Sequence, residues 1–105
     1  MGEDKLSLLG MAARARAVTS GGTLTENAIR GGEAYFVIIA EDASEGTKKR
    51  IQDKCSFYHV PYVFCGTQDD LGHRIGKEAR STVAVLQEGF AKEFIKRFGI
   101  EIQEV

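Results

Sequence analysis

Ala34-Tyr35-Phe36-Val37-Ile38-Ile39-Ala40 is the stretch that decides the fold. It is an unbroken apolar run rich in β-branched and aromatic residues, which is typical of a strand buried on both faces. Two further runs, Val60–Cys65 and Thr82–Leu86, have the same character. Since a sheet with two buried faces needs helices on both sides, the sequence predicts layers of helices around a small sheet.

The segments between these runs have the composition of helices. Good helix formers and apolar residues at helical spacing predict helices over residues 4–17, 24–30, 44–57 and 90–98, with a further one starting near residue 67. Thr23-Leu24-Thr25-Glu26 fits a capping box for the second of these helices, which Gly31-Gly32 closes. The alternation of helices and strands predicts the α/β class.

Length and composition indicate one soluble domain. The chain has 105 residues, of which 43% are apolar and 28% charged, so we expect a single domain over residues 1–105 with its core at about 4–98. No apolar run approaches the ~20 residues that cross a bilayer, and the acidic start is not a secretory signal. Cys55 and Cys65 are expected to be reduced thiols, so the sequence predicts a cytoplasmic protein with no membrane partner.

The distribution of charge is more informative than the total. The net charge of −1 excludes a bulk polycation, yet residues 5–32 and 72–86 each carry more basic than acidic side chains, and the remainder is acidic. If the two segments meet, they form a basic face suited to phosphates. The turn Gly21-Gly22-Thr23 lies in the first segment and is either a tight turn with a cap or an anion site at a helix N-terminus.

Three other groupings contain residue types suited to different chemistry. One combines residues that bind zinc, at a spacing that matches no common site: Cys55, His59, Cys65 and His73. Glu41-Asp42 follows the first strand, where loop structure or helix capping is favoured over catalysis. Gly72-His73-Arg74-Ile75-Gly76-Lys77-Glu78 is one residue short of a phosphate loop and has Glu in place of Ser or Thr. We therefore expect no catalytic residue, no metal and no cofactor.

An ordered series of short motifs carries a family resemblance. The pieces are Ser20-Gly21-Gly22-Thr23, Val37-Ile38-Ile39-Ala40-Glu41-Asp42-Ala43-Ser44, Cys55, Val60-Pro61-Tyr62, Leu71-Gly72, Ile75-Gly76 and Val83-Ala84-Val85-Leu86. From about residue 6 to 98 the chain resembles the ribosomal protein 7Ae/30e family of the large subunit, whose members bind kink-turn RNA, and within it the small bacterial members. The resemblance implies a three-layer α/β/α sandwich around a four-stranded mixed sheet, with the fourth strand near Val18-Thr19.

The resemblance also implies an RNA-binding site made of two elements, the glycine turn with the start of the second helix and the loop before the last strand. The residues that it assigns to the site are Gly21, Gly22, Thr23, Leu24, Asn27, Arg30, Lys77, Glu78, Ala79, Arg80 and Ser81. Thr23, Leu24 and Asn27 stand where the family usually has Asn, Glu and Lys, so this chain lacks the usual guanine acceptor and phosphate cation. Contact with RNA then shifts toward the nearby cations, Arg14, Arg16, Arg30, Lys77 and Arg80.

We expect from this resemblance a non-enzymatic, ribosome-associated protein. Its partners would be ribosomal RNA or another kink-turn-like RNA, together with ribosomal proteins, and no DNA. A second hypothesis is a protein-interaction module that kept the fold and lost kink-turn specificity, motivated by Thr23, Leu24 and Asn27. A third, a small-ligand or enzymatic site, rests on Glu41-Asp42 alone.

Overall fold

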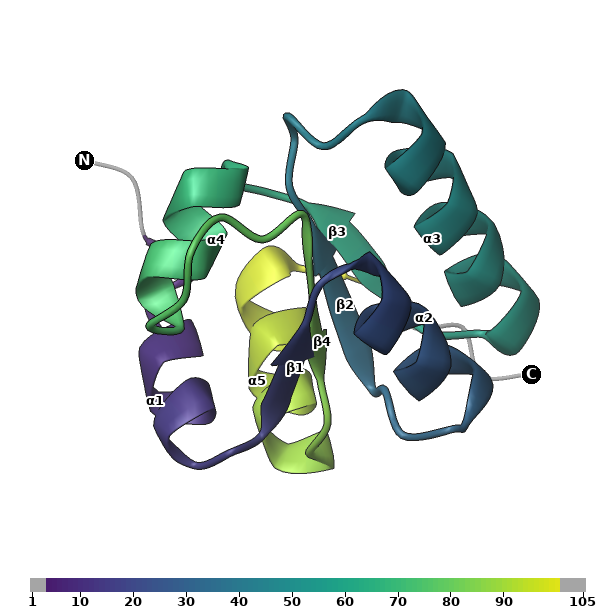
Figure 1. Ribbon diagram of the computed structural model, residues 1–105. Helices are drawn as coiled ribbons and strands as arrows, with labels where there is room; N and C mark the ends of the chain where they lie inside the picture. The colour runs from purple at the N-terminus through teal and green to yellow at the C-terminus, as the bar shows by residue number, and fades with distance from the viewer. Residues whose placement is uncertain (1–3, 101–105) are drawn as a thin grey trace.

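The computed structural model of the chain describes residues 4–100. Helices and strands alternate along this range (Figure 1). In chain order they are α1 (Leu9–Arg14), β1 (Val18–Ser20), α2 (Gly22–Arg30), β2 (Phe36–Ile39), α3 (Glu45–Tyr58), β3 (Tyr62–Phe64), α4 (Gln68–Arg74), β4 (Thr82–Val85) and α5 (Glu88–Phe98).

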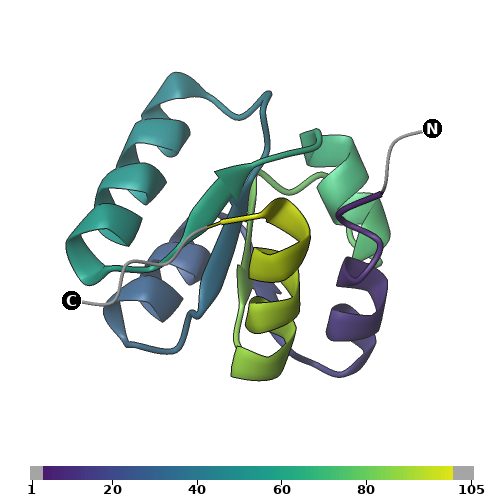
Figure 2. The same ribbon diagram turned by 180° about the vertical axis from the view of Figure 1, so that it is seen from behind.

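The strands form one mixed sheet in the order β1-β4-β2-β3. β2 and β3 run parallel with Val37 opposite Tyr62, whereas β4 lies antiparallel to both β1 and β2. α2 and α3 cover one face of the sheet, and α5 covers the other with α1 and α4 beside it (Figure 1 and Figure 2). This arrangement confirms the predicted three-layer α/β/α sandwich with a four-stranded mixed sheet, including a strand at Val18-Thr19.

The centre of the core lies on the two middle strands. Every residue of β2 and β4 is buried, because each strand has a neighbour on both sides and helices over both faces. Phe36 on β2 stacks on Phe94 of α5 with 5.6 Å between ring centroids. α3 contributes Ile51 and Cys55, both fully buried. The apolar run at residues 34–40 is therefore the middle of the molecule, as its composition predicts.

The first helix is shorter than predicted. Residues 5–8 form turns in which the Ser7 N–H donates to the Asp4 carbonyl and the Leu9 N–H to the Leu6 carbonyl. Each of these bonds spans three residues instead of the four of an α-helix. α1 ends at Arg14, and Arg16 has a φ of 58°, which redirects the chain into β1.

The predicted capping box is wrong. α2 begins at Gly22, so Thr23 lies inside the helix, and no side chain caps its N-terminus. Gly21 precedes it with a φ of 92°, a conformation that suits glycine and turns the chain from β1 directly into α2. The Glu26 carboxylate instead forms an ion pair with Arg50 Nε of α3 at 3.5 Å.

Residues 101–105, at the end of the domain expected over residues 1–105, lie outside the described residues. No helix between residues 4 and 100 is long and apolar enough to cross a membrane.

A buried hydrogen bond joins α2 to β4. Thr25 and Thr82 are both fully buried, and the Thr82 hydroxyl donates to Thr25 Oγ1 at 2.9 Å. The Gly21 N–H donates to the Thr82 carbonyl at 3.0 Å beside it. These bonds hold the first turn of α2 against the first residue of β4.

Replacing Thr25 with Val tests this joint. Val has nearly the same shape, so the change removes the acceptor of the Thr82 hydroxyl while the packing stays, and should cost about 1–3 kcal/mol. The double change Thr25→Val with Thr82→Val leaves no buried hydroxyl there and should recover most of that loss. Urea unfolding followed by circular dichroism measures both. A double variant as unstable as the sum of the two single variants would contradict the account.

Candidate functional site

The glycine turn leaves a row of amide groups open at the start of α2. The first helical bond of α2 runs from the Thr25 N–H to the Gly21 carbonyl at 2.9 Å. The N–H groups of Gly22, Thr23 and Leu24 therefore have no acceptor within residues 4–100. Free amides at a helix N-terminus, aligned with the positive end of the helix dipole, favour an anion.

The loop of residues 77–81 lies beside this turn, and α4 holds it there. The Lys77 N–H donates to the Gly72 carbonyl at 2.8 Å, and the Arg80 N–H donates to the Gln68 carbonyl at 3.0 Å. A Cβ on Gly72 would overlap the carbonyl group of Glu78. Gly72 lies in the stretch that partly resembles a phosphate loop, but its role here is structural. Because it has no side chain, the loop of residues 77–81 can pack on α4.

Arg80 links the two elements. Its Nε donates to Ser20 Oγ of β1 at 3.2 Å, and its Nη1 donates to the Ala79 carbonyl at 3.1 Å. The guanidinium group therefore fixes the loop against the end of β1, next to the glycine turn. The sequence predicted Arg80 as an RNA contact and gave no sign of this bridging role.

A hollow of about 400 Å³ lies between the two elements. Its lining residues come from α1 and the turn after it, from β1 and α2, and from the segment after α4; they are Ala13, Arg16, Val18, Thr19, Ser20, Leu24, Ile75, Lys77 and Arg80. Aliphatic side chains contribute the apolar part, including Leu24, whose surface is 57% exposed. Arg16, Lys77 and Arg80 are the cations of this hollow, and within residues 4–100 none of them is in an ion pair.

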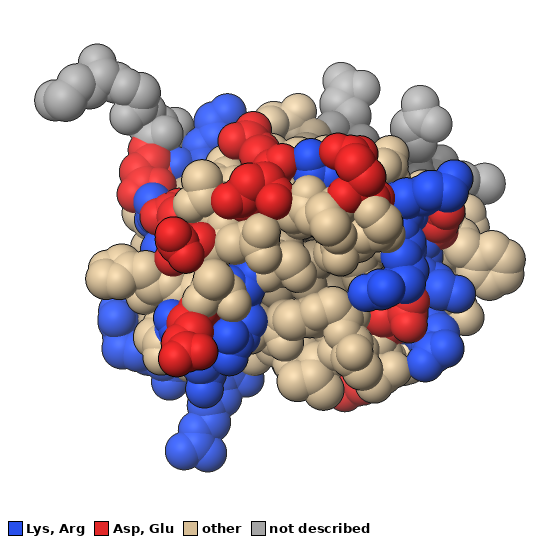
Figure 3. Space-filling model, turned by 45° about the horizontal axis from the view of Figure 1, so that its top comes forward, with Lys and Arg blue, Asp and Glu red and all other residues tan. Residues whose placement is uncertain are grey.

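The hollow brings together the two basic segments that the sequence singled out. Arg16 belongs to residues 5–32, and Lys77 and Arg80 belong to residues 72–86. Figure 3 shows basic side chains gathered at the lower left and, along α3, at the right, each group with a few acidic side chains among them; uncharged surface lies between the two groups, and further acidic groups lie above. Arg74 does not contribute free charge, because it pairs with Asp4 and Asp70 at 3.0 Å each. Those contacts raise the pKa of Arg74 against the opposing effect of burial.

The predicted site residues divide into groups in the structure. Leu24, Lys77 and Arg80 line the hollow, and Gly21, Gly22 and Thr23 form the turn at its edge. Arg30 lies at the other end of α2, where its Nη2 donates to Asn27 Oδ1 at 2.9 Å. Glu78 and Ala79 are exposed on the loop, and Ser81 is half-buried, with its carbonyl accepting from the Ala40 N–H.

Three residues of the observed site, Thr19, Ser20 and Gly72, were not predicted from the sequence to take part in it. A fourth, Arg16, was predicted only as one of several nearby cations. The two positions on β1 follow from the strand itself, because it forms one wall of the hollow. The only signal for Gly72 was its place inside a helical segment, where a glycine lowers helix stability and so points to a packing reason without showing which neighbour it meets.

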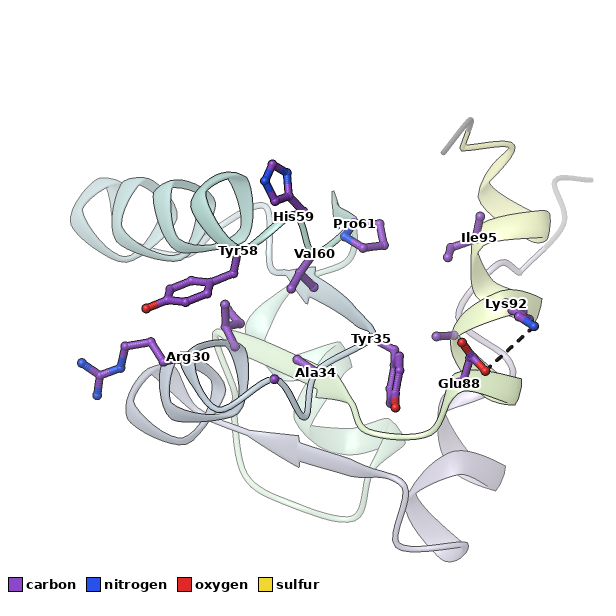
Figure 4. A pocket seen from close by; sticks show the side chains of 13 residues that line it. Arg30, Ala34, Tyr35, Tyr58, His59, Val60, Pro61, Glu88, Lys92 and Ile95 are labelled. Atoms are coloured by element: carbon purple, nitrogen blue, oxygen red, sulfur yellow. Dashed lines mark ion pairs between the residues drawn. The ribbon is translucent and has the colours of Figure 1, made fainter. Parts of the chain in front are cut away.

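Arg30 borders a second hollow, of about 390 Å³, between the C-terminal ends of α2 and α3 and one side of α5. Figure 4 shows its apolar floor near Ala34 and Val60, with the rings of Tyr35 and Tyr58 at opposite sides. Lys92 lies on the α5 side and pairs with Glu88. None of the residues of the glycine turn or the loop lines this second hollow.

The two remaining groupings from the sequence, Glu41-Asp42 and the series of Cys and His residues, do not form a catalytic or metal site in the part of the chain that the structure describes. The Asp42 carboxylate accepts from the Gln68 N–H at 2.8 Å, so it adds to the cap that Thr67 forms at the start of α4, in line with the expected capping role. Burial raises the pKa of the Cys55 thiol to about 12, which keeps it protonated and a poor metal ligand at neutral pH. Across residues 4–100 no group of three or more His, Cys, Asp or Glu side chains is placed to hold a metal ion.

Known proteins resemble the chain over nearly all of it. Residues 4–95 match the Ribosomal protein L7Ae/L30e/S12e/Gadd45 family. RNA-binding protein YlxQ of Bacillus subtilis (strain 168) is 47% identical over 94 residues, which span 90% of this chain and 94% of that protein. RNA-binding protein YlxQ of Enterococcus faecium is 39% identical over 91 residues, 87% of each chain.

Solved structures agree with this assignment. A protein of unknown function from Bacillus halodurans C superposes with a TM-score of 0.87 at 36% identity, covering 93% of this chain and 99% of that one. The 15.5kD RNA binding protein of Giardia lamblia has a TM-score of 0.79 at 22% identity, covering 94% and 88%, and supports the fold alone. The family match, the relatives and the fold confirm the resemblance predicted from the motifs: the chain belongs to the Ribosomal protein L7Ae/L30e/S12e/Gadd45 family.

Proposed function

We propose that this protein binds a sharply bent, kink-turn-like RNA in the hollow between the glycine turn and the loop of residues 77–81. The observation that carries the proposal is the set of three cations outside any ion pair within residues 4–100, Arg16, Lys77 and Arg80, around an apolar floor beside the open amides of α2. The printed names of its relatives, RNA-binding protein YlxQ, support a binding function and not an enzymatic one.

The proposed contacts divide by chemistry. The amides of Gly22 to Leu24 suit one phosphate, and the cations of the rim suit others. Exposed Leu24 offers an apolar surface to a base or sugar that a bend has turned out of its stack. A straight duplex presents its phosphates along two regular ridges, whereas a bent RNA brings phosphates and unstacked bases to one compact place. The geometry therefore favours a shape-selective site over a general coating surface.

Selectivity in this chain depends on different groups from those usual in the family. Leu24 cannot accept a hydrogen bond from a guanine edge, and the Asn27 side-chain oxygen is occupied by Arg30. Contacts to phosphates fix position and orientation, and they carry no base sequence directly. We therefore propose that this protein selects the shape of the bend more than the identity of its bases.

The cellular setting is part of the same proposal. We place the protein in the cytoplasm with ribosomal RNA, or another RNA of the same shape, as its partner and with ribosomal proteins as neighbours. The alternative is a protein-interaction module, which the apolar hollow of Figure 4 favours, since Tyr35 and Tyr58 expose 43% and 40% of their surface there. Filter-binding titration with a kink-turn RNA and a straight duplex of equal length separates the two.

Removing one cation from the rim tests the site. Lys77→Ala should weaken binding of a kink-turn RNA several-fold. It should also reduce the magnitude of the slope of log affinity against log salt concentration by about one. Filter binding over a series of KCl concentrations measures both quantities. Lys92→Ala on α5 is the matched control, because it removes the same charge from the hollow of Figure 4. Equal effects of the two changes would mean that only the total charge matters and would contradict the site.

Displacing the loop without changing charge gives a second test. Gly72→Ala places a methyl group against the Glu78 carbonyl, so the loop must move away from α4 and carry Lys77 with it. We expect weaker binding of the kink-turn RNA and an unchanged far-ultraviolet circular dichroism spectrum. Gly89→Ala in α5 is the control, since its new methyl group would meet no heavy atom within 4 Å apart from its chain neighbours and the backbone of its own helix. If Gly72→Ala bound RNA as well as Gly89→Ala does, loop position would not matter.

A further inference from the structure

The outer face of α3 carries a stripe of cationic and aromatic side chains that the proposed site does not use. Arg50, Lys54, Phe57 and Tyr58 are spaced at about one and two helical turns and so lie on one face. Together with Asp53 they line a shallow hollow of about 490 Å³. The adjoining face of the helix buries Ile51 and Cys55 in the core, and the stripe beside it lies at the surface.

Phe57 is the prominent member of the stripe. Its surface is 75% exposed, more than that of any other large apolar side chain within residues 4–100. Tyr58 meets it in an edge-to-face contact with 4.9 Å between ring centroids, which orients the ring and leaves most of its surface in solvent. An aromatic ring held in this way is a platform on which a flat partner can stack.

The stripe begins at the proposed RNA site. Gly22 lies in the first turn of α2, and a Cβ there would be 2.8 Å from Nη2 of Arg50. The Arg50 guanidinium therefore lies against the turn whose amides are open, and its Nε is held by Glu26 at 3.5 Å. From Arg50 to Phe57 the helix rises by about 10 Å, a span that a few nucleotides cover.

The charge of α3 favours a polyanion. Lys48, Lys49, Arg50 and Lys54 lie on this helix with two acidic residues, Glu45 and Asp53. Lys48 pairs with Glu45, and Lys54 is in no ion pair within residues 4–100. Figure 3 shows the blue side chains of α3 separated by uncharged surface from the cations at the lower left. Cations alternating with exposed aromatic rings are typical of surfaces that bind single-stranded nucleic acid without sequence preference.

We propose that α3 binds the single strand that leaves the bent RNA: a base stacks on Phe57, and its phosphates contact Arg50 and Lys54. This inference rests on the proposed function, because the hollow must hold the bent RNA for a strand to reach α3. It adds a second RNA surface with a different chemistry, stacking instead of shape selection. A protein partner is the less favoured occupant, since the stripe is mainly charged and has no continuous apolar floor.

A tryptophan probe tests the stacking directly, because the chain contains no Trp. Phe57→Trp should fold normally at so exposed a position and keep the platform. Three kink-turn RNAs are titrated: one without a tail, one with a single-stranded adenosine tail at each end, and one with abasic tails of equal length. We expect the adenosine tails to raise affinity about tenfold and to quench the fluorescence of the introduced indole, whereas the abasic tails keep the charge and do not quench.

Two further variants complete the experiment. Phe57→Ala should bind the untailed RNA as the unaltered protein does and lose the gain from the adenosine tails. Phe64→Trp is the matched control, since Phe64 is an aromatic residue on β3 with 39% of its surface exposed, and the fluorescence of this variant should show no quenching that depends on the tail.

The outcomes separate the two proposals. If the untailed RNA binds and the adenosine tails add neither affinity nor quenching, the inference about α3 is wrong and the proposed function stands; an α3 that docks a protein gives this result. Equal quenching by adenosine and abasic tails also overturns the stacking. If no kink-turn RNA binds the unaltered protein, the proposed function and the inference about α3 both fall.

Discussion

The joint between the first turn of α2 and the first residue of β4 is the constraint on which the candidate site depends. Thr82 donates from its buried hydroxyl to Thr25 and accepts at its carbonyl from Gly21, so side chain and backbone act on the same spot. β4 lies between β1 and β2 in the sheet, which makes this joint part of the rigid core. The glycine turn bonds to this joint through Gly21, and the loop of residues 77–81 leads directly into it at Thr82. The distance between the turn and the loop is therefore set by the core and not by their own flexibility.

Each side of the hollow is then fixed by a short-range contact. Arg80 holds the loop to Ser20, and Gly72 allows the same loop to rest on α4. The other cations of the hollow, Arg16 and Lys77, are in no ion pair within residues 4–100, whereas Arg74 pairs with Asp4 and Asp70. A protein of net charge −1 can thus present a local basic site, because three cations, Arg16, Lys77 and Arg80, gather there around one exposed carboxylate, that of Glu78.

Local pattern was enough to predict most of the fold. The apolar run at residues 34–40 indicated a buried strand by composition alone, and the family resemblance supplied β1, which at three residues is too short to detect by periodicity. The capping box at Thr23 was wrong because a glycine with positive φ starts α2 earlier than a side-chain cap would. No sequence pattern could indicate that Arg80 reaches Ser20, sixty positions earlier, or that Gly72 meets the Glu78 carbonyl, because both depend on how α4 packs beside β4.

The central claim is that bent RNA sits between the glycine turn and the loop before β4. An amide NMR titration of the isotope-labelled protein with a kink-turn RNA tests it most directly, because it reports every backbone amide at once. We expect the largest shift changes at Gly22 to Leu24 and at residues 77–81, with the amides of Gly32, Ala34 and Val60 unchanged. Shift changes concentrated around the hollow of Figure 4, with the glycine turn unaffected, would contradict it.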